Sequence, residues 1–159
     1  MFYSYYNSPF GKIALTANEQ GLTSLTFMDG KKEFTLPKDH QKNPDKFKQV
    51  CQQLTEYFNG DRKVFDLPLA AQGTPFQQKV WQTLRNIKQG ETKTYAWLAK
   101  KINNEKAVRA VGTANGANPI GLIVPCHRVI GSNGKLTGYA GGLGLKAKLL
   151  MHEGAQFKP

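Results

Sequence analysis

Apolar and β-branched side chains near the N-terminus follow a pattern that is typical of β-strands. Such residues are enriched in Phe2–Tyr6, Lys12–Ala17 and Leu22–Phe27. Asn18–Gly21 supplies the polar turn of a hairpin between the second and third of these segments. A lysine-rich polar stretch from Asp29 to Lys42 follows and is expected to include a loop. The N-terminal pattern therefore predicts a small sheet.

The pattern then changes to the period of a helix. Asn43 offers an N-cap, with Pro44 at the first helical position. Apolar residues follow at helical spacing, and Gly60 supplies the C-terminal stop: Phe47, Val50, Leu54 and Phe58. Val64–Leu67 is expected to add one short strand. This part of the chain shows no visible chemistry.

Helical patterns dominate the rest of the chain. Residues 67–73 have the composition of a linker, and Thr74-Pro75 begins a helix. Two more helical patterns, 94–102 and 105–115, flank the short turn Asn103-Asn104, which makes a candidate helix-turn-helix. The predicted class is α+β, with a small sheet-plus-helix domain at 1–70 and a mostly helical domain at 71–159.

The second helix of this pair has an unusual outward face. Its buried side is predicted to consist of Ala107, Ala110, Val111 and Ala114. Arg109 points nearly opposite, beside Gly112 and Thr113, although glycines inside a helix cost about 1 kcal/mol each. Such a face fits close approach to a DNA minor groove with Arg109 inserted into the base stack. Packing against another part of the protein would also favour small residues, and the sequence leaves both explanations open.

Charge is distributed unevenly along the chain, whose net charge is +11. Residues 1–70 carry nine Lys/Arg and eight Asp/Glu, whereas residues 71–159 carry thirteen Lys/Arg and three Asp/Glu. The excess positive charge of the second part attracts polyanions such as a phosphate backbone. A solvated basic surface is the alternative interpretation.

Cys126 is the candidate reactive residue. It follows Pro125 at the end of the apolar run Ile120–Val124 and precedes His127-Arg128. Nearby positive charge lowers the pKa of a thiol, and a hydrogen-bonded base can supply the thiolate on demand. An inert buried cysteine is the alternative. Neither a metal nor a cofactor is expected, because the other candidate ligands show no ligand spacing: Cys51, His40 and His152.

These motifs together resemble the O6-alkylguanine-DNA alkyltransferases. The resemblance rests on the sequences PCHRV, NP, YAWLA, RAVG, GYAGG and HEG between about Thr74 and Ala155. It implies a DNA repair protein that transfers the alkyl group of O6-alkylguanine in duplex DNA to its own Cys126, once and irreversibly. The damaged base must be flipped out of the duplex, because its alkyl carbon cannot be reached inside the stack.

The resemblance also implies roles for individual residues. Cys126 would attack the alkyl carbon, His127 would act as its base through a water, and Glu153 would orient the imidazole. Tyr95 would donate a hydrogen bond to the flipped guanine, and Asn118 would tie the recognition helix to the cysteine segment. The residues expected to contact DNA are Arg109, which fills the gap in the duplex, Ala107, Gly112, Thr113 and Arg128. The expected substrate pocket consists of Val129, Tyr139 and Ala140.

A wing is expected beside the helix-turn-helix. Ser132–Gly134 has the composition of a tight turn, which would join Arg128–Ile130 to Leu136–Tyr139. The last helix, from Leu143 to Met151, would then deliver Glu153. His152 is expected to be a solvated residue at the C-terminus of this helix.

Two other functions compete with alkyl transfer. One is a non-enzymatic sensor of alkylated bases, against which the presence of Cys126 argues. The other is a cysteine hydrolase, which would leave Arg109 and the basic second part unexplained. Met1–Phe10 lacks the pattern of a secretory signal, and no apolar run approaches the length of a membrane span. We therefore expect a cytoplasmic monomer whose partner is double-stranded DNA.

Overall fold

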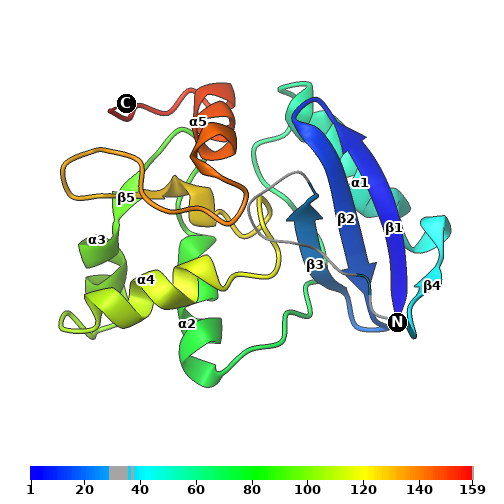
Figure 1. Ribbon diagram of the computed structural model, residues 1–159, viewed down its shortest axis with the longest axis horizontal. Helices are drawn as coiled ribbons and strands as arrows, with labels where there is room; N and C mark the ends of the chain where they lie inside the picture. The colour runs from blue at the N-terminus through cyan, green and yellow to red at the C-terminus, as the bar shows by residue number, and fades with distance from the viewer. Residues whose placement is uncertain (29–35, 37, 159) are drawn as a thin grey trace.

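A four-stranded sheet forms the N-terminal part of the computed structural model, which describes residues 1–28, 36 and 38–158 (Figure 1). The strand order is β3-β2-β1-β4, with β1 antiparallel to β2, β2 antiparallel to β3, and β1 parallel to β4. The strands are β1 (Phe2–Ser8), β2 (Gly11–Ala17), β3 (Leu22–Phe27) and β4 (Gln41–Lys42). The three strands and the hairpin expected near the N-terminus are confirmed. Most of the lysine-rich stretch lies outside the described residues.

One helix, α1 (Lys48–Phe58), covers this sheet. Its start differs from the prediction, because Pro44–Phe47 forms the 3₁₀ helix η1 and the Asn43 side chain makes no capping hydrogen bond. The prediction of a strand at Val64–Leu67 is wrong. The chain there forms no strand, and the sheet is reached only beyond it, where Leu22 bridges Leu69 in parallel.

The outer edge of β3 is covered by a segment from the second part of the chain. The Leu25 amide donates to the Pro119 carbonyl at 2.9 Å, and the Gly121 amide donates to the Leu25 carbonyl at 3.1 Å. Pairing of this kind satisfies an edge that would otherwise be open to other chains. It also fixes the segment that leads to Cys126 directly beside the sheet.

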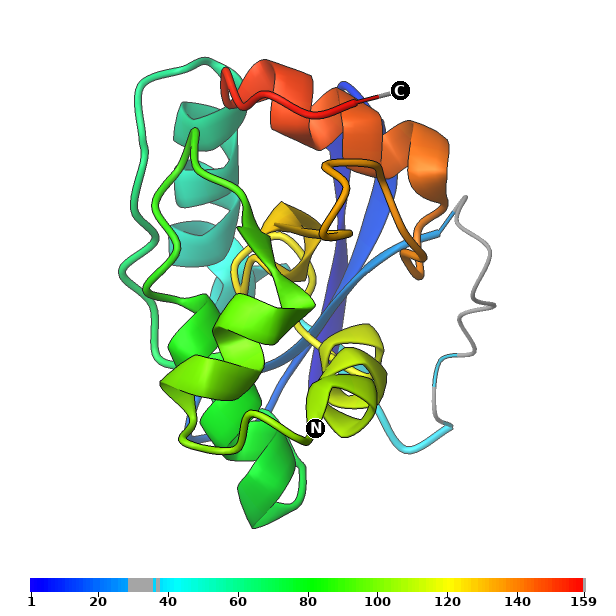
Figure 2. The ribbon, with the colours of Figure 1, turned by 90° about the vertical axis from the view of Figure 1, so that its left-hand side faces the viewer.

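Four helices build the second part of the chain (Figure 2). They are α2 (Pro75–Leu84), α3 (Tyr95–Lys101), α4 (Val108–Gly116) and α5 (Leu143–His152). The Trp81 indole nitrogen donates to the Ala114 carbonyl at 2.8 Å, which joins α2 to α4. Asn103 lies in the turn between α3 and α4 with φ of 59°, a left-handed conformation that asparagine tolerates better than most residues. The α+β class is confirmed, and none of the described helices has the length and apolarity needed to cross a bilayer.

Three details of this part differ from the predictions. Helix α4 begins at Val108 rather than at residue 105, and Ala110 is exposed rather than buried. The expected wing hairpin is absent, because β6 (Val129–Ile130) pairs in parallel with β5 (Lys93–Thr94) and residues 136–139 form no strand. The tight turn at 132–134 does form, with the Gly134 amide donating to the Gly131 carbonyl.

Replacing Thr74 by alanine should lower the free energy of unfolding by about 1 kcal/mol, because α2 loses its N-cap. The Thr74 hydroxyl accepts from the Gln77 amide at 3.1 Å, and the Gln77 side chain accepts from the Thr74 amide at 2.9 Å. This reciprocal capping box satisfies two backbone donors at once. Denaturant unfolding of Thr74→Ala and of the control Thr83→Ala, whose hydroxyl caps nothing, checks the prediction. Equal losses in the two variants would show that the box contributes no more than an ordinary helix residue.

Candidate active site

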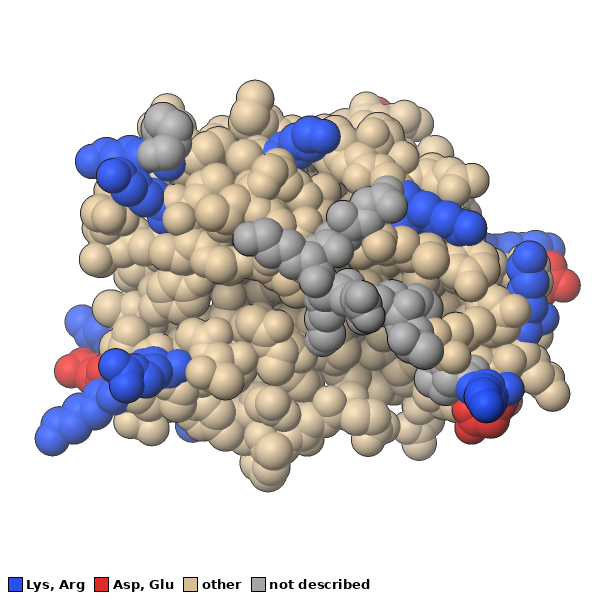
Figure 3. All heavy atoms as spheres, in the orientation of Figure 1, with Lys and Arg blue, Asp and Glu red and all other residues tan. Residues whose placement is uncertain are grey.

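Cys126 lies in the wall of a pocket formed where the sheet meets the helical part. It opens the 3₁₀ helix η2 (Cys126–Arg128) and is buried, with 7% of its surface exposed. The other lining residues come from β3, the end of α4 and the loop before α5: Leu25, Thr26, Phe27, Asn115, Gly116, Asn118, Pro119, Gly121, Gly138, Tyr139, Ala140 and Gly141. On the face drawn in Figure 3, the coloured basic side chains lie around the edge, while uncharged residues occupy the part of the centre not covered in grey.

Asn118 fixes the backbone that carries Cys126 into this pocket. Its side-chain nitrogen donates to the Val124 carbonyl at 2.8 Å and to the Ile120 carbonyl at 3.3 Å. Its side-chain oxygen accepts from the Ile120 amide at 3.0 Å. Since Asn118 follows α4 by two residues, these bonds tie the end of that helix to the cysteine segment, the arrangement that the family resemblance implied.

The thiol of Cys126 differs from the expectation that neighbouring charge would activate it. Burial raises the pKa of Cys126, and the Asn118 side chain and the charge of Lys146 oppose this only in part. The flanking His127 and Arg128 do not help, because both side chains point away into the core. The resting site therefore holds a thiol, and a base must take its proton during the reaction.

A buried cluster stands behind Cys126. His127 Nε2 lies 2.8 Å from Glu153 Oε2, and both side chains are fully buried. Arg128 Nε donates to Glu153 Oε1 at 2.8 Å, and an Arg128 terminal nitrogen donates to Glu153 Oε2 at 3.1 Å. The Tyr57 hydroxyl donates to Glu153 Oε2 at 2.6 Å. One carboxylate thus receives donors from both parts of the chain.

The cluster sets the charges of its own members. Burial alone would raise the pKa of Glu153, but His127 and Arg128 outweigh it and hold that pKa at about 2. Burial lowers the pKa of His127, and the neighbouring Glu153 does not offset this. The described site therefore pairs an ionised Glu153 with a neutral imidazole. Because Nε2 faces the carboxylate, Nδ1 is the nitrogen left to accept a proton, and it is buried without a partner among the described residues.

Arg128 is a correction to the expected DNA-contact residues. Its side chain is buried, and besides Glu153 it binds the Ile87 carbonyl at 2.6 Å. With its donors directed inward, Arg128 cannot reach a phosphate. His152 is a second correction, since its ring packs against Tyr57 and its Nε2 lies 2.8 Å from the Tyr57 carbonyl.

Lys146 belongs to the site although the sequence interpretation assigned it only to the last helix. Its side chain is completely buried, and Nζ donates to the Val129 carbonyl at 2.6 Å and to the Thr137 carbonyl at 3.1 Å. Burial lowers the pKa of Lys146 to about 8, an effect that Cys126 partly opposes. A lysine within the apolar stripe of α5, between Leu143 and Leu150, was the signal that could have revealed it.

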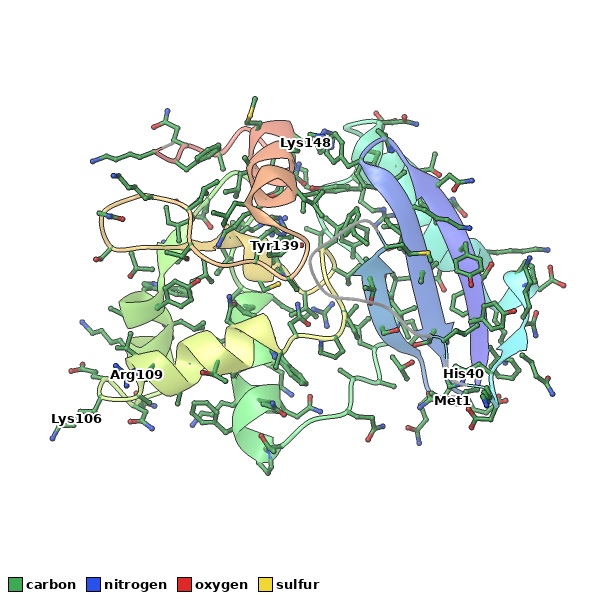
Figure 4. All side chains as sticks on the ribbon, in the orientation of Figure 1. Met1, His40, Lys106, Arg109, Tyr139 and Lys148 are labelled. Atoms are coloured by element: carbon green, nitrogen blue, oxygen red, sulfur yellow. The ribbon has the colours of Figure 1, made fainter. Side chains whose placement is uncertain are left out.

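The expected pocket residues divide into two groups. Tyr139 and Ala140 line the pocket, and Tyr139 lies between α5 and the sheet (Figure 4). Val129 is fully buried in β6 and lines no part of the pocket. Tyr95 is likewise not among the residues that line the pocket. Its hydroxyl lies 2.6 Å from the Thr137 hydroxyl. Thr137 therefore holds Tyr95 beside the loop that closes the pocket.

The outer face of α4 is open. Arg109 is exposed near the start of the helix, close to Lys106 (Figure 4), and Thr113 is exposed one turn later. A Cβ built on Gly112 would lie 3.7 Å from the Tyr95 ring, which is ordinary contact, and one built on Gly116 would meet nothing within 4 Å among the described residues. Packing inside the protein therefore does not require these two glycines.

Both parts of the chain match domains of one known protein family. Residues 75–155 match the family described as 6-O-methylguanine DNA methyltransferase, DNA binding domain. Residues 1–71 match the 6-O-methylguanine DNA methyltransferase, ribonuclease-like domain.

Full-length relatives agree with these matches. The methylated-DNA–protein-cysteine methyltransferase of Methanosarcina acetivorans is 52% identical over 98% of this chain and 99% of its own. The constitutive enzyme of the same name from Bacillus subtilis is 44% identical over 99% of this chain and 98% of its own. The crystal structure of Mycobacterium tuberculosis OGT in complex with DNA superimposes with a TM-score of 0.90 at 43% identity, covering 97% of this chain and 93% of that one. The chain therefore belongs to the 6-O-methylguanine DNA methyltransferase family.

Proposed function

We propose that this protein repairs DNA by transferring the alkyl group of O6-alkylguanine to its own Cys126. The observation that carries the proposal is the position of this thiol: it faces a pocket beside α4, and the next residue, His127, is bound to a buried carboxylate. The relatives named above, which are called methylated-DNA–protein-cysteine methyltransferases, support the same reaction.

The reaction balances within the site. The Cys126 sulfur forms a bond to the alkyl carbon while the bond from that carbon to guanine O6 breaks. His127 Nδ1 takes the thiol proton through a water, and Glu153 stabilises the imidazolium that forms. The imidazolium then gives this proton, through water, to the ring of the guanine, which remains in the DNA as the neutral base, and Tyr95 donates a hydrogen bond to that base. The thioether is stable, so each chain reacts once.

The residues around the reacting atoms also have roles in the proposed reaction. Tyr139 and Ala140 border the flipped base, and Val129 stands behind them as the residue whose main chain holds the pocket loop through Lys146. Ala107, Gly112 and Thr113 lie against the minor groove, with Arg109 filling the gap that the flipped base leaves. We further propose that residues 1–70 and 71–159 are separate domains, and that the protein works as a cytoplasmic monomer.

The intact mass of the protein tests the proposed reaction. After incubation with a duplex oligonucleotide carrying O6-methylguanine, we expect one methyl group per chain, mapped by peptide analysis to Cys126, and no further turnover. Repeated turnover without a mass change would instead indicate a hydrolase. Tight binding without a mass change would indicate a sensor of alkylated bases.

Replacing Arg109 by alanine should slow repair of duplex DNA far more than reaction with free O6-alkylguanine base. The physical reason is that only the duplex substrate needs a side chain to replace the flipped base in the stack. Single-turnover rates on both substrates check this. Lys106→Ala is the matched control, since it removes a neighbouring exposed cation without touching the outer face of α4. Equal loss on both substrates, or an equal duplex defect in the control, would contradict the insertion of Arg109.

A further inference from the structure

Tyr57 joins the sheet-bearing part of the chain to the buried cluster behind Cys126. It lies near the C-terminal end of α1, which meets the C-terminal end of α5 (Figures 1 and 2). Its side chain is fully buried, and its hydroxyl donates to Glu153 Oε2 at 2.6 Å. On the same residue, the main-chain carbonyl lies 2.8 Å from His152 Nε2. Two hydrogen bonds therefore connect Tyr57 to adjacent residues at the end of α5.

A buried tyrosine hydroxyl usually has a hydrogen-bond partner, so a hydrogen bond alone would indicate only packing. The choice of partner atom is what distinguishes Tyr57. Glu153 Oε2 is the oxygen that faces His127 Nε2 at 2.8 Å, and it also accepts from Arg128 at 3.1 Å. Three donors thus converge on one oxygen. The hydroxyl of Tyr57 competes directly with the imidazole for the electrons of that oxygen.

We propose that Tyr57 is a positioning residue for alkyl transfer, whose hydroxyl fixes the Glu153 carboxylate and limits how tightly it holds the His127 imidazole. This inference rests on the proposed function, in which His127 is the base. A carboxylate with one fewer donor is a stronger acceptor, and it would hold a proton on the imidazole more firmly. Through Tyr57, the N-terminal part of the chain sets the basicity of the reaction centre.

The other charged and titratable groups around His127 stay in place when the hydroxyl is removed. Arg128 and Lys146 lie on the basic side of the cluster and lower the pKa of His127, whereas Glu153 raises it. Cys126, Tyr139 and His152 are further titratable groups near the site in the described residues, and the His152 ring packs against Tyr57. Among these groups, Glu153 is the one that hydrogen-bonds the Tyr57 hydroxyl in the described part of the chain. A change seen in Tyr57→Phe can therefore be assigned to the carboxylate.

The test is the pH dependence of single-turnover alkyl transfer in Tyr57→Phe. The ring and its contacts with Phe58, Phe65 and His152 remain, so the variant loses the hydroxyl alone. We expect the rate to fall about threefold to tenfold, the range of one hydrogen bond. The acid limb of the profile should move to higher pH, by about half a unit, as the pKa of His127 rises. An NMR titration of the His127 ring should show the same shift without any substrate.

Tyr6→Phe is the matched control. It removes another tyrosine hydroxyl that binds α1, at 2.8 Å from the Thr55 hydroxyl, but has no contact with Glu153. We expect its acid limb and His127 titration to match the unchanged protein. If Tyr57→Phe behaves like Tyr6→Phe in both readouts, Tyr57 is a packing residue and the inference is wrong.

A second variant covers the case in which Tyr57→Phe fails to fold. Site-specific 3-fluorotyrosine at position 57 keeps the hydroxyl and makes it a stronger donor, so the acid limb should move to lower pH. An unchanged limb, or a shift to higher pH, would contradict the inference. Failure of the unchanged protein to accept any alkyl group would instead overturn the proposed function, so the two failures are distinguishable.

Discussion

Replacing Cys126 by alanine should abolish alkyl transfer completely while leaving the affinity for duplex DNA unchanged. The sulfur is the atom that accepts the alkyl group, and alanine has no atom that can form the new bond. In the proposed function, DNA binding depends instead on the exposed face of α4, and Cys126 is only 7% exposed. Intact mass after incubation with methylated duplex, together with a DNA-binding titration, measures both parts of the prediction.

Cys51→Ala is the control for this variant. Cys51 is the other free cysteine, half-buried on α1, and burial raises the pKa of its thiol as well. We expect it to accept no alkyl group and its replacement to leave transfer intact. A methylated Cys51, or weak DNA binding by Cys126→Ala, would mean that docking and chemistry are not separate in this protein.

The burial of Cys126 also affects how its thiol becomes reactive. A thiolate maintained by neighbouring charge would be reactive toward any electrophile that reached it. Here burial raises the pKa of the thiol, and His127 Nδ1 is the acceptor that we propose for its proton. In the proposed reaction, the nucleophile is therefore generated when a substrate and the connecting water fill the pocket. Such a site protects a residue that can be used only once.

The sequence predicted the parts of the site that depend on neighbouring residues. Cys126 and His127 are adjacent, and Asn118 lies two residues beyond the end of α4, so the motifs that carry the family resemblance implied that these residues belong to one site. Tyr57 was missed because spacing alone permits either Tyr57 or Phe58, three or four residues after Leu54, to face the core. The structure buries Tyr57 completely and leaves Phe58 half-buried.

The failed wing prediction has a related cause. A hairpin of Arg128–Ile130 with Leu136–Tyr139 would have used main-chain groups that a distant side chain occupies instead. The Lys146 side chain donates hydrogen bonds to the carbonyls of Val129 and Thr137. In addition, β6 pairs with β5, which lies far away in the sequence. Tertiary contacts of this kind override local turn signals, and no local pattern records them.

Replacing Glu153 by glutamine should lower the free energy of unfolding by about 3–5 kcal/mol, because it leaves Arg128 as a buried charge without its counterion. Arg128 would keep the Ile87 carbonyl, at 2.6 Å, and at most one uncharged amide oxygen at position 153 as partners. Alkyl transfer should also fall steeply, since a neutral amide cannot stabilise the imidazolium of His127. Denaturant unfolding at neutral pH and single-turnover kinetics measure the two effects. Glu56→Gln is the matched control, because its ion pair with Arg62 is partly exposed and is worth at most about 1 kcal/mol.

The pH dependence of unfolding separates the charge of Glu153 from its shape. The pKa of Glu153 is lowered from 4.5 to about 2 in the folded protein, so its contribution to stability is complete above about pH 4.5 and is lost as the pH falls toward 2. Glutamine cannot titrate, so the difference in stability between the unchanged protein and Glu153→Gln should narrow over that range. A difference that stays constant from pH 5 to about pH 2 would show that packing, rather than the ion pair with Arg128, makes Glu153 necessary. Narrowing would instead show that the charge of Glu153 stabilises the fold, because it neutralises the buried guanidinium of Arg128.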